Sequence, residues 1–313
     1  MQQRNLPGFG TCLGFFLFIA ILCFPAGTAA AVPAFSYSFP QQDNKKEASN
    51  ARTVVGIPET YTIQPGDTLL DVAREYDLGY IDLRRLYPEM DPWLPPSGQE
   101  LILPLQWVLP PKEKADIVVN LPELRLYHFS KQNGVSLVRS YPVGIGDRES
   151  QSPLGEFPVG EKRENPYWYI PESLQDKYGM QIMDPGPGNP LGNYWIGLDS
   201  SSYGLHGTNN PWSVGRLATN GCIRLYPEHI QPLFQEVSPG EKVQVIYEPV
   251  KLGLLMGRVF AEAHPDIYGK LEDYVNYAYR KLLDSGYSRK VDLRKFRQVL
   301  QDKNGLPVDI SRD

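Results

Sequence analysis

The chain has 313 residues, of which 42% are hydrophobic and 21% are charged, and its formal net charge is −5. This composition is too apolar for a disordered protein, and the length suits about two domains of roughly 100–200 residues each. The acidic balance argues against a nucleic-acid partner, because nucleic-acid-binding domains usually carry a basic excess. The 29 prolines and 28 glycines predict many turns and a loop-rich, β-rich body.

The first 30 residues are typical of a secretory signal peptide. An apolar run over 13–24 follows Arg4 and is followed by small residues, the pattern of a short hydrophobic core before a cleavage site. A membrane anchor is the less favoured alternative, because a spanning helix needs about 20 apolar residues. Lipid attachment at Cys23 is disfavoured because bulky residues precede it. We expect cleavage near Ala30 and an exported protein in the periplasm or cell wall.

Residues 31–58 predict a flexible tether, because they are rich in Pro, Ser, Gln, Asn and Lys and show no apolar periodicity. A compact pattern over 59–104 then predicts a β-α-α-β unit. A short strand at Tyr61 leads to a Pro-Gly turn, Asp67 or Thr68 can cap the first helix, and apolar residues follow at helical spacing. The second helix and the last strand are expected over 81–87 and 100–103.

The string YTIQPGDTLLDVA, at residues 61–73, resembles the LysM family. This resemblance implies that the unit binds glycan strands containing N-acetylglucosamine, here those of peptidoglycan. The alternative is a small structural cap without a ligand.

Residues 115–249 carry short strand signals that Gly/Pro loops divide. No long helical period interrupts them, so an antiparallel barrel or sandwich is favoured over parallel βαβ units. The strands are expected at 117–121, 124–129, 137–143, 157–159, 194–198 and 242–247.

Residues 250–313 predict a helical appendage. Apolar residues recur at helical spacing from Ile267 to Leu282, after Pro265, and a second helix is expected over 293–300. The chain as a whole is therefore expected to be an α+β multidomain protein, with a mostly β catalytic domain between the β-α-α-β unit and the helices.

The chemistry is expected at Cys222, the one cysteine outside the N-terminal apolar stretch. A single remaining thiol excludes a disulfide framework and a cysteine zinc site. It is either buried and inert or used as a nucleophile. His206 lies 16 residues upstream across a Gly/Asn/Pro-rich stretch, so the imidazole can reach the sulfur. A nearby imidazolium would lower the pKa of the thiol and generate the thiolate.

The string HGTNNPWSVGRLATNGCIRLYPEHI, at residues 206–230, closely resembles the signature of L,D-transpeptidases, the YkuD-like cysteine enzymes of peptidoglycan cross-linking. Further matching strings follow the family in the right order, so the resemblance extends over about 135 residues. They lie at 141–146, 152–157, 165–169 and 186–192.

The resemblance implies roles for individual residues. Cys222 is the nucleophile and His206 the general base, while the Gly207 carbonyl orients the imidazole. Backbone N–H groups around Gly221 and Cys222 form the oxyanion site, and Arg224 orders the catalytic loop or binds a substrate carboxylate.

Three further positions, Thr208, Thr219 and Asn220, are expected to contact the substrate. Some family members have histidine where Asn220 stands, so a second histidine is not expected to be essential. Asn220 is expected to supply a hydrogen bond instead.

The mechanism implied is a two-step acyl transfer. The thiolate attacks the carbonyl that joins an L-centre to the terminal D-residue of a tetrapeptide stem. The D-residue is released, and the rest of the stem stays bound to the cysteine as a thioester. An amine of another stem, or of an envelope protein, then attacks. The alternatives are an L,D-carboxypeptidase or endopeptidase, in which water is the acceptor, and a non-catalytic wall-binding protein.

No cofactor or metal is expected. His128, His229 and His264 have no metal-ligand spacing and are expected to be surface or packing residues. Gly144 and Gly146 begin a pattern like a dinucleotide-binding loop, but no third glycine follows. The expected partners are therefore peptidoglycan strands and stems.

Overall fold

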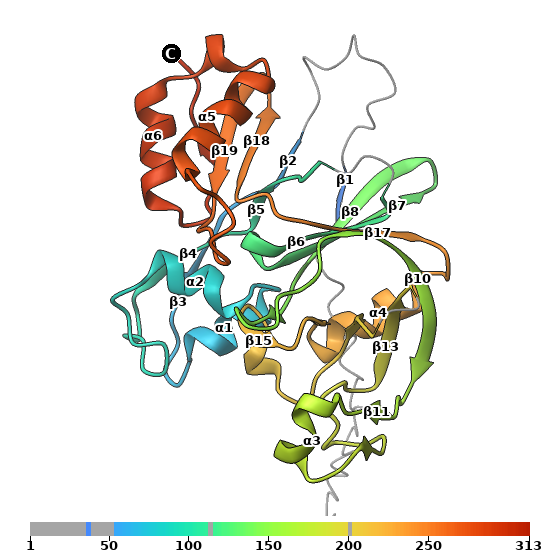
Figure 1. The fold of residues 1–313 in the computed structure, drawn as a ribbon. Helices are drawn as coiled ribbons and strands as arrows, with labels where there is room; N and C mark the ends of the chain where they lie inside the picture. Colours follow the sequence, from blue (N-terminus) through green and yellow to red (C-terminus); the bar gives the residue numbers. More distant parts are fainter. Residues whose placement is uncertain (1–35, 39–52, 112–114, 200–201) are drawn as a thin grey trace, which may run out of the picture. The chain divides into compact units, whose positions relative to one another are not determined.

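The computed structural model describes residues 36–38, 53–111, 115–199 and 202–313 (Figure 1). The predicted signal peptide at 1–30, with Cys12 and Cys23, lies outside these residues. In the part of the chain that is described, no helix is both long enough and apolar enough to cross a bilayer.

Nine strands form one curled sheet in the order β1-β8-β7-β6-β17-β10-β13-β14-β16 (Figure 1). The pairs β6–β17 and β14–β16 are parallel and the others antiparallel, so the expectation of a purely antiparallel barrel or sandwich is wrong. A parallel pair needs a crossover of about a dozen residues or more. The loop between β14 and β16 supplies one without an α-helix. The bounds are Ser36–Ser38 (β1), Ile117–Asn120 (β6), Arg125–Gln132 (β7), Val135–Pro142 (β8), Gly155–Glu164 (β10), Tyr194–Leu198 (β13), Gly204–His206 (β14), Ile223–Arg224 (β16) and Lys242–Ile246 (β17).

The six strands expected between 115 and 249 are all present, with bounds shifted by a few residues. The helix α4, Pro227–Glu236, was not expected. Its Ile230 and Leu233 pack into one core with Leu205 of β14 and Ile223 of β16. The short strands β14 and β16 are therefore anchored to the main apolar core of the sheet.

The expected strand–helix–helix–strand order over 59–104 is present. It consists of β3 (Glu59–Thr62), α1 (Leu69–Glu75), α2 (Tyr80–Leu86) and β4 (Glu100–Leu103). Thr68 caps α1, because its Oγ1 accepts a hydrogen bond from the Asp71 N–H at 3.1 Å. Asp67, the other candidate cap, accepts instead from the Gln64 N–H at 2.7 Å and closes the preceding turn.

The expected tether over 31–58 is wrong at both of its described parts. β1 pairs with β8, and β2 (Val54–Gly56) pairs with β5 (Gln106–Val108). Val54 and Val55 have no exposed surface. β1 and β2 have only three residues each, which is too short for a periodic signal in the sequence. Residues 36–38 and 54–56 are therefore part of the folded body.

The β-α-α-β unit is docked firmly against the sheet and α4. Arg74 of α1 pairs with Glu228 of α4 at 2.6 Å, and buried Arg125 of β7 pairs with Asp82 of α2 at 2.7 Å. The backbone also fits closely, because a Cβ atom on Gly79 would lie 2.8 Å from the Cα of Gly215. The unit therefore contacts the stretch between β14 and β16 directly.

The segment 250–313 contains more than the expected helices. β18 (Val250–Leu255), β19 (Arg258–Ala263) and β20 (Val308–Asp309) form a three-stranded sheet with α5 (Tyr274–Asp284) and α6 (Leu293–Asp302) (Figure 1). Met256 and Gly257, with φ of 52° and 78°, make the hairpin turn that helical spacing did not indicate.

The expected helix start at Pro265 is also wrong, because α5 is capped by Asp273. Before it, the Asp266 carboxylate accepts hydrogen bonds from the N–H groups of Lys270 and Leu271, each at 2.9 Å. These bonds fold residues 264–272 into a loop, although Ile267 and Leu271 keep a helical spacing. The expected helix over 293–300 is confirmed as α6.

A buried charge cluster joins the C-terminal segment to the rest of the molecule. The Lys251 Nζ lies 2.8 Å from carboxylates of both Glu123 and Glu262, and it donates to the Val108 carbonyl at 2.6 Å. Glu123, Glu262 and His264 could by geometry hold a cation, since one ligand atom from each lies within 4.8 Å of the others. The Lys251 ammonium already supplies the positive charge there.

Replacing Lys251 by Met should lower the free energy of unfolding by about 3–5 kcal/mol, because two buried carboxylates lose their counter-charge. Lys281→Met is the matched control. Lys281 pairs with Glu248, but both side chains are partly exposed, so the loss should stay below about 1 kcal/mol. Urea unfolding followed by circular dichroism measures both. Equal losses in the two variants would contradict a stabilising role for the buried cluster.

Candidate active site

The parallel pairing of β14 with β16 brings the two central site residues together. The register pairs Leu205 with Ile223 and His206 with Arg224. Side chains alternate between the faces of a strand, so Cys222, one residue before β16, faces the same side as His206 and Arg224. Both His206 and Cys222 line one cleft. The approach expected from a folded-back loop is thus achieved by two short strands.

The imidazole of His206 is buried and held in one orientation. Its Nδ1 lies 2.6 Å from the Gly207 carbonyl oxygen. A carbonyl can only accept, so Nδ1 carries the proton and Nε2 keeps its lone pair. The Trp195 ring stacks on the imidazole with centroids 6.0 Å apart. Burial, and secondarily the charge of Arg224, lowers the pKa of His206 to about 3.

The thiol of Cys222 is partly buried, and its Sγ lies 3.8 Å from the Ser202 carbonyl oxygen. Burial raises the pKa of Cys222 to about 11, against the opposing effects of a hydrogen bond from the Gly204 backbone and the charge of Arg224. The expectation that an imidazolium lowers the pKa of the thiol is therefore wrong for this state. Near pH 7 both the thiol and the imidazole are neutral.

Arg224 is held beside this pair. Its Nη1 donates to the Ser213 Oγ at 2.8 Å, which ties the loop after β14 to β16. Its Nε is buried without a hydrogen-bond partner among the described residues, and the side chain lines the cleft. The arginine can therefore order the loop and still offer a donor to a ligand. Ser213 was not expected from the sequence, and no pattern singles it out.

The turn before Cys222 is tightly constrained. The Thr219 Oγ1 donates to the Cys222 carbonyl oxygen at 2.6 Å. Gly221 has φ of +98°, and a Cβ atom there would lie 2.4 Å from the Tyr203 ring, so only glycine fits. This close contact explains the glycine before the cysteine, and Tyr203 is a cleft residue that the sequence did not indicate.

The three positions expected at the substrate differ in placement. Thr219 and Asn220 line the cleft. Thr208 does not: it is 5% exposed, and its Oγ1 accepts from the Asn210 N–H at 2.9 Å. Its role is to shape the loop after His206, and the expectation of a direct substrate contact fails because the side chain turns inward.

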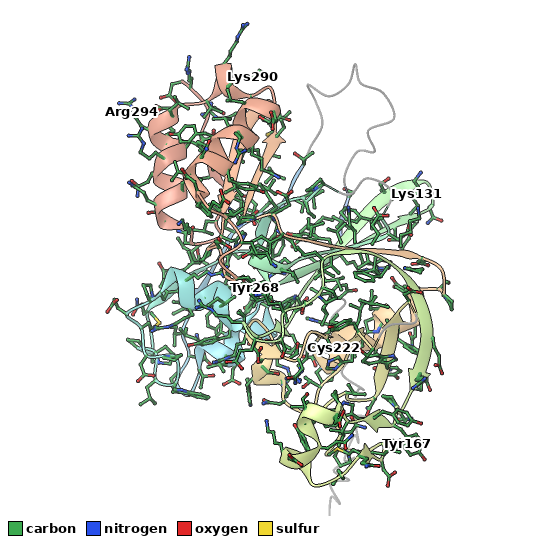
Figure 2. All side chains as sticks on the ribbon, viewed as in Figure 1. Lys131, Tyr167, Cys222, Tyr268, Lys290 and Arg294 are labelled. Atoms are coloured by element: carbon green, nitrogen blue, oxygen red, sulfur yellow. The ribbon has the colours of Figure 1, made fainter. Side chains whose placement is uncertain are left out.

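The cleft has a volume of about 790 Å³. His206, Cys222 and Arg224 line it together with residues of the segment 166–178, which includes β11 (Trp168–Tyr169) and α3 (Glu172–Tyr178). Tyr167 and Tyr169 on this segment are 53% and 64% exposed. Figure 2 marks Cys222 and Tyr167. A cleft of this size, open to solvent and aromatic on one side, suits an extended peptide.

Part of the chain is similar to a known family and to a solved structure. The YkuD family, described as the L,D-transpeptidase catalytic domain, matches residues 114–245. The NMR structure of the catalytic domain from E. faecium L,D-transpeptidase is 23% identical, with a TM-score of 0.34, over 44% of this chain and 98% of that one.

Two relatives match over much more of the chain. "Probable L,D-transpeptidase YcfS" of Escherichia coli K12 is 30% identical over 94% of this chain and 94% of its own length. "Probable L,D-transpeptidase YbiS" of the same strain is 33% identical over 72% of this chain and 73% of its own length. The chain therefore belongs to the L,D-transpeptidase family.

If Cys222 attacks the stem with His206 as its base, as proposed below, the neutral pair predicts a flat pH profile for this step. Protonation of His206 would remove the base, but with a pKa near 3 the imidazole stays neutral down to about pH 5, and the thiol stays protonated up to about pH 8. The single-turnover rate constant for acylation of Cys222 by a tetrapeptide stem, measured by stopped-flow or rapid-quench mass spectrometry, should vary less than about twofold in this range. A tenfold fall between about pH 7 and pH 5.5, as for a histidine of ordinary pKa, would contradict it.

Proposed function

We propose that this protein is a peptidoglycan L,D-transpeptidase that works through a thioester on Cys222. The observation that carries the proposal is the parallel register by which the Cys222 thiol and the His206 imidazole share one sheet face and line one cleft. Family membership supports the reaction class, and the cleft dimensions support a peptide substrate. The substrate class is the tetrapeptide stem of peptidoglycan.

The first step starts from neutral groups. As the Cys222 sulfur attacks the carbonyl carbon, the thiol proton passes to Nε2 of His206, and backbone N–H groups around Gly221 stabilise the oxyanion. When the tetrahedral intermediate collapses, the C–N bond breaks and the imidazolium returns its proton to the leaving D-amino acid. The Gly207 carbonyl keeps the imidazole aligned throughout, because Nδ1 remains its hydrogen-bond donor.

Arg224 is proposed to bind the carboxylate at the end of the stem. Its unpartnered buried Nε and its position on the cleft wall support this role, since a charged donor buried without a partner favours an anionic ligand. The arginine keeps its bond to Ser213 through Nη1. One side chain therefore serves both alternatives considered for it.

The second step transfers the acyl group. An amine attacks the thioester carbon, His206 takes the amine proton, and the Cys222 thiol is regenerated when the C–S bond breaks. The acceptor is the side-chain amine of another stem, giving a 3-3 cross-link, or a lysine of an envelope protein. With water as acceptor the same site would act as an L,D-carboxypeptidase or endopeptidase.

Incubating the protein with a disaccharide-tetrapeptide should yield D-alanine, a cross-linked dimer and an acylated Cys222, all visible by mass spectrometry. Cys222→Ala should lose all three, a fall of at least about 10³-fold, because no nucleophile remains. His128→Gln, a buried histidine outside the cleft, is the control and should retain activity. Free D-alanine without dimer would identify the hydrolase. If wild type shows neither an acylated Cys222 nor released D-alanine, the protein is instead a non-catalytic wall-binding protein.

The β-α-α-β unit is proposed to bind glycan, as its resemblance to the LysM family implies. Trp93 and Leu94, in the loop between α2 and β4, are 58% and 80% exposed and adjacent. The Asp91 Oδ1 accepts from the Trp93 N–H at 2.8 Å and fixes this loop. Two adjacent exposed apolar side chains on a fixed loop support this role. The substrate and the N-terminal apolar run both support export to the periplasm or cell wall.

Trp93→Ala should weaken co-sedimentation with insoluble peptidoglycan by about tenfold, because an aromatic anchor of this size commonly carries 1–2 kcal/mol of binding or more. Trp212→Ala, which removes a 40% exposed tryptophan outside the unit, is the control and should bind like wild type. Equal binding by wild type and Trp93→Ala would favour the structural-cap alternative.

A further inference from the structure

The C-terminal segment reaches the catalytic sheet through one tyrosine. Tyr268, in the loop after β19, donates from its hydroxyl to the Gly146 carbonyl at 2.6 Å. The Ser152 Oγ accepts from the Gly146 N–H at 3.0 Å. Tyr268, marked in Figure 2, thus connects a distant part of the chain to the strand β9 (Ile145–Gly146).

The loop presents this hydroxyl in a fixed position. The Tyr268 N–H donates to the Tyr247 hydroxyl at 2.9 Å, and the two rings stack with centroids 6.0 Å apart. The Tyr247 hydroxyl also donates to Asp266, whose carboxylate closes the loop. Ile267, next to Tyr268, is buried in the core of the nine-stranded sheet. The loop therefore has little freedom to move the phenol away.

A short chain of contacts leads from Gly146 to the nucleophile. β9 pairs in parallel with β15 (Leu217–Thr219), with Gly146 opposite Thr219. The Asp147 N–H donates to the Thr219 carbonyl at 3.0 Å. The Thr219 Oγ1 then donates to the Cys222 carbonyl at 2.6 Å. A shift of Gly146 would therefore move the peptide of Cys222, because Thr219 is hydrogen bonded to both sides.

The backbone around Gly146 is closely packed. A Cβ atom on Gly146 would lie 2.2 Å from the Ser150 carbonyl oxygen. Ser150 itself lines the cleft, and the Gln151 carbonyl lies 3.4 Å from where a Cβ on Gly221 would be. Residues 146–152 are thus packed between Tyr268 on one side and the turn before Cys222 on the other.

We propose that Tyr268 is a positioning residue for the reaction, and that the C-terminal segment buttresses the oxyanion site through it. The proposal rests on the function proposed for Cys222. The phenol holds Gly146, β9 holds Thr219, and Thr219 sets the peptide planes whose N–H groups meet the oxyanion. Tyr268 is not among the residues that line the cleft.

Tyr268→Phe tests this role because it removes the hydroxyl and keeps the ring. The rate constant for stem-dependent D-alanine release should fall about tenfold, with KM changed less than about twofold, since the transition state loses alignment and the bound substrate does not. Alkylation of Cys222 by iodoacetamide forms no oxyanion, so its rate constant should stay within about twofold of wild type.

Tyr274→Phe is the matched control. Its hydroxyl donates to the His264 carbonyl at 2.7 Å, a comparable bond in the same segment that does not contact residues 146–152. It should lower the melting temperature as much as Tyr268→Phe does and keep the wild-type rate. An unchanged rate in Tyr268→Phe overturns the proposal, as does an equal fall in Tyr274→Phe or an equal fall in alkylation. Wild type without thioester or D-alanine would instead overturn the proposed function, and this proposal with it.

Discussion

The parallel pairing of β14 with β16 is the constraint on which the rest of the site depends. It places Leu205 and Ile223 in the core and, by alternation, His206 and Cys222 on the opposite face. Because both strands are very short, their register is fixed by this core anchoring and by the glycines beside them. The loop that joins them must then run back to the end of the sheet at which β14 begins, and its residues Ala218, Thr219 and Asn220 line the cleft.

Other parts of the chain converge on that loop and on its neighbours. The β-α-α-β unit contacts it at Gly215, and the ring of Tyr80 in α2 stacks under the Arg216 guanidinium, 3.8 Å from the ring centroid. The C-terminal segment reaches it through Tyr268 and β9. Two short strands alone would not hold the site residues rigidly. Packing from the β-α-α-β unit and the C-terminal segment holds them in place. This accounts for the close association of these elements with the sheet.

Sequence patterns predicted the longer strands, and five of the residues expected at the site, His206, Thr219, Asn220, Cys222 and Arg224, line one cleft. The patterns failed where the elements are short or where burial decides. β17 shows clear alternation, whereas β14 and β16 contain two or three ordered residues among glycines and carry no periodic signal. The hairpin at Met256 was missed because the helical spacing over 267–282 led to a helical prediction for the whole segment 250–313. The pKa values of Cys222 and His206 depend mainly on burial, which the sequence does not reveal.

The Cys222 thiol and the His206 imidazole are both neutral near pH 7, and the imidazole is fixed as the Nδ1–H tautomer. Burial of both groups and the Gly207 carbonyl carry this claim. The ¹⁵N chemical shifts of the His206 ring, assigned by comparison with His206→Gln, measure it directly. We predict a protonated Nδ1 and an unprotonated Nε2 from about pH 5 to about pH 8. Two protonated nitrogens at pH 7 would reveal a thiolate–imidazolium pair and contradict the account.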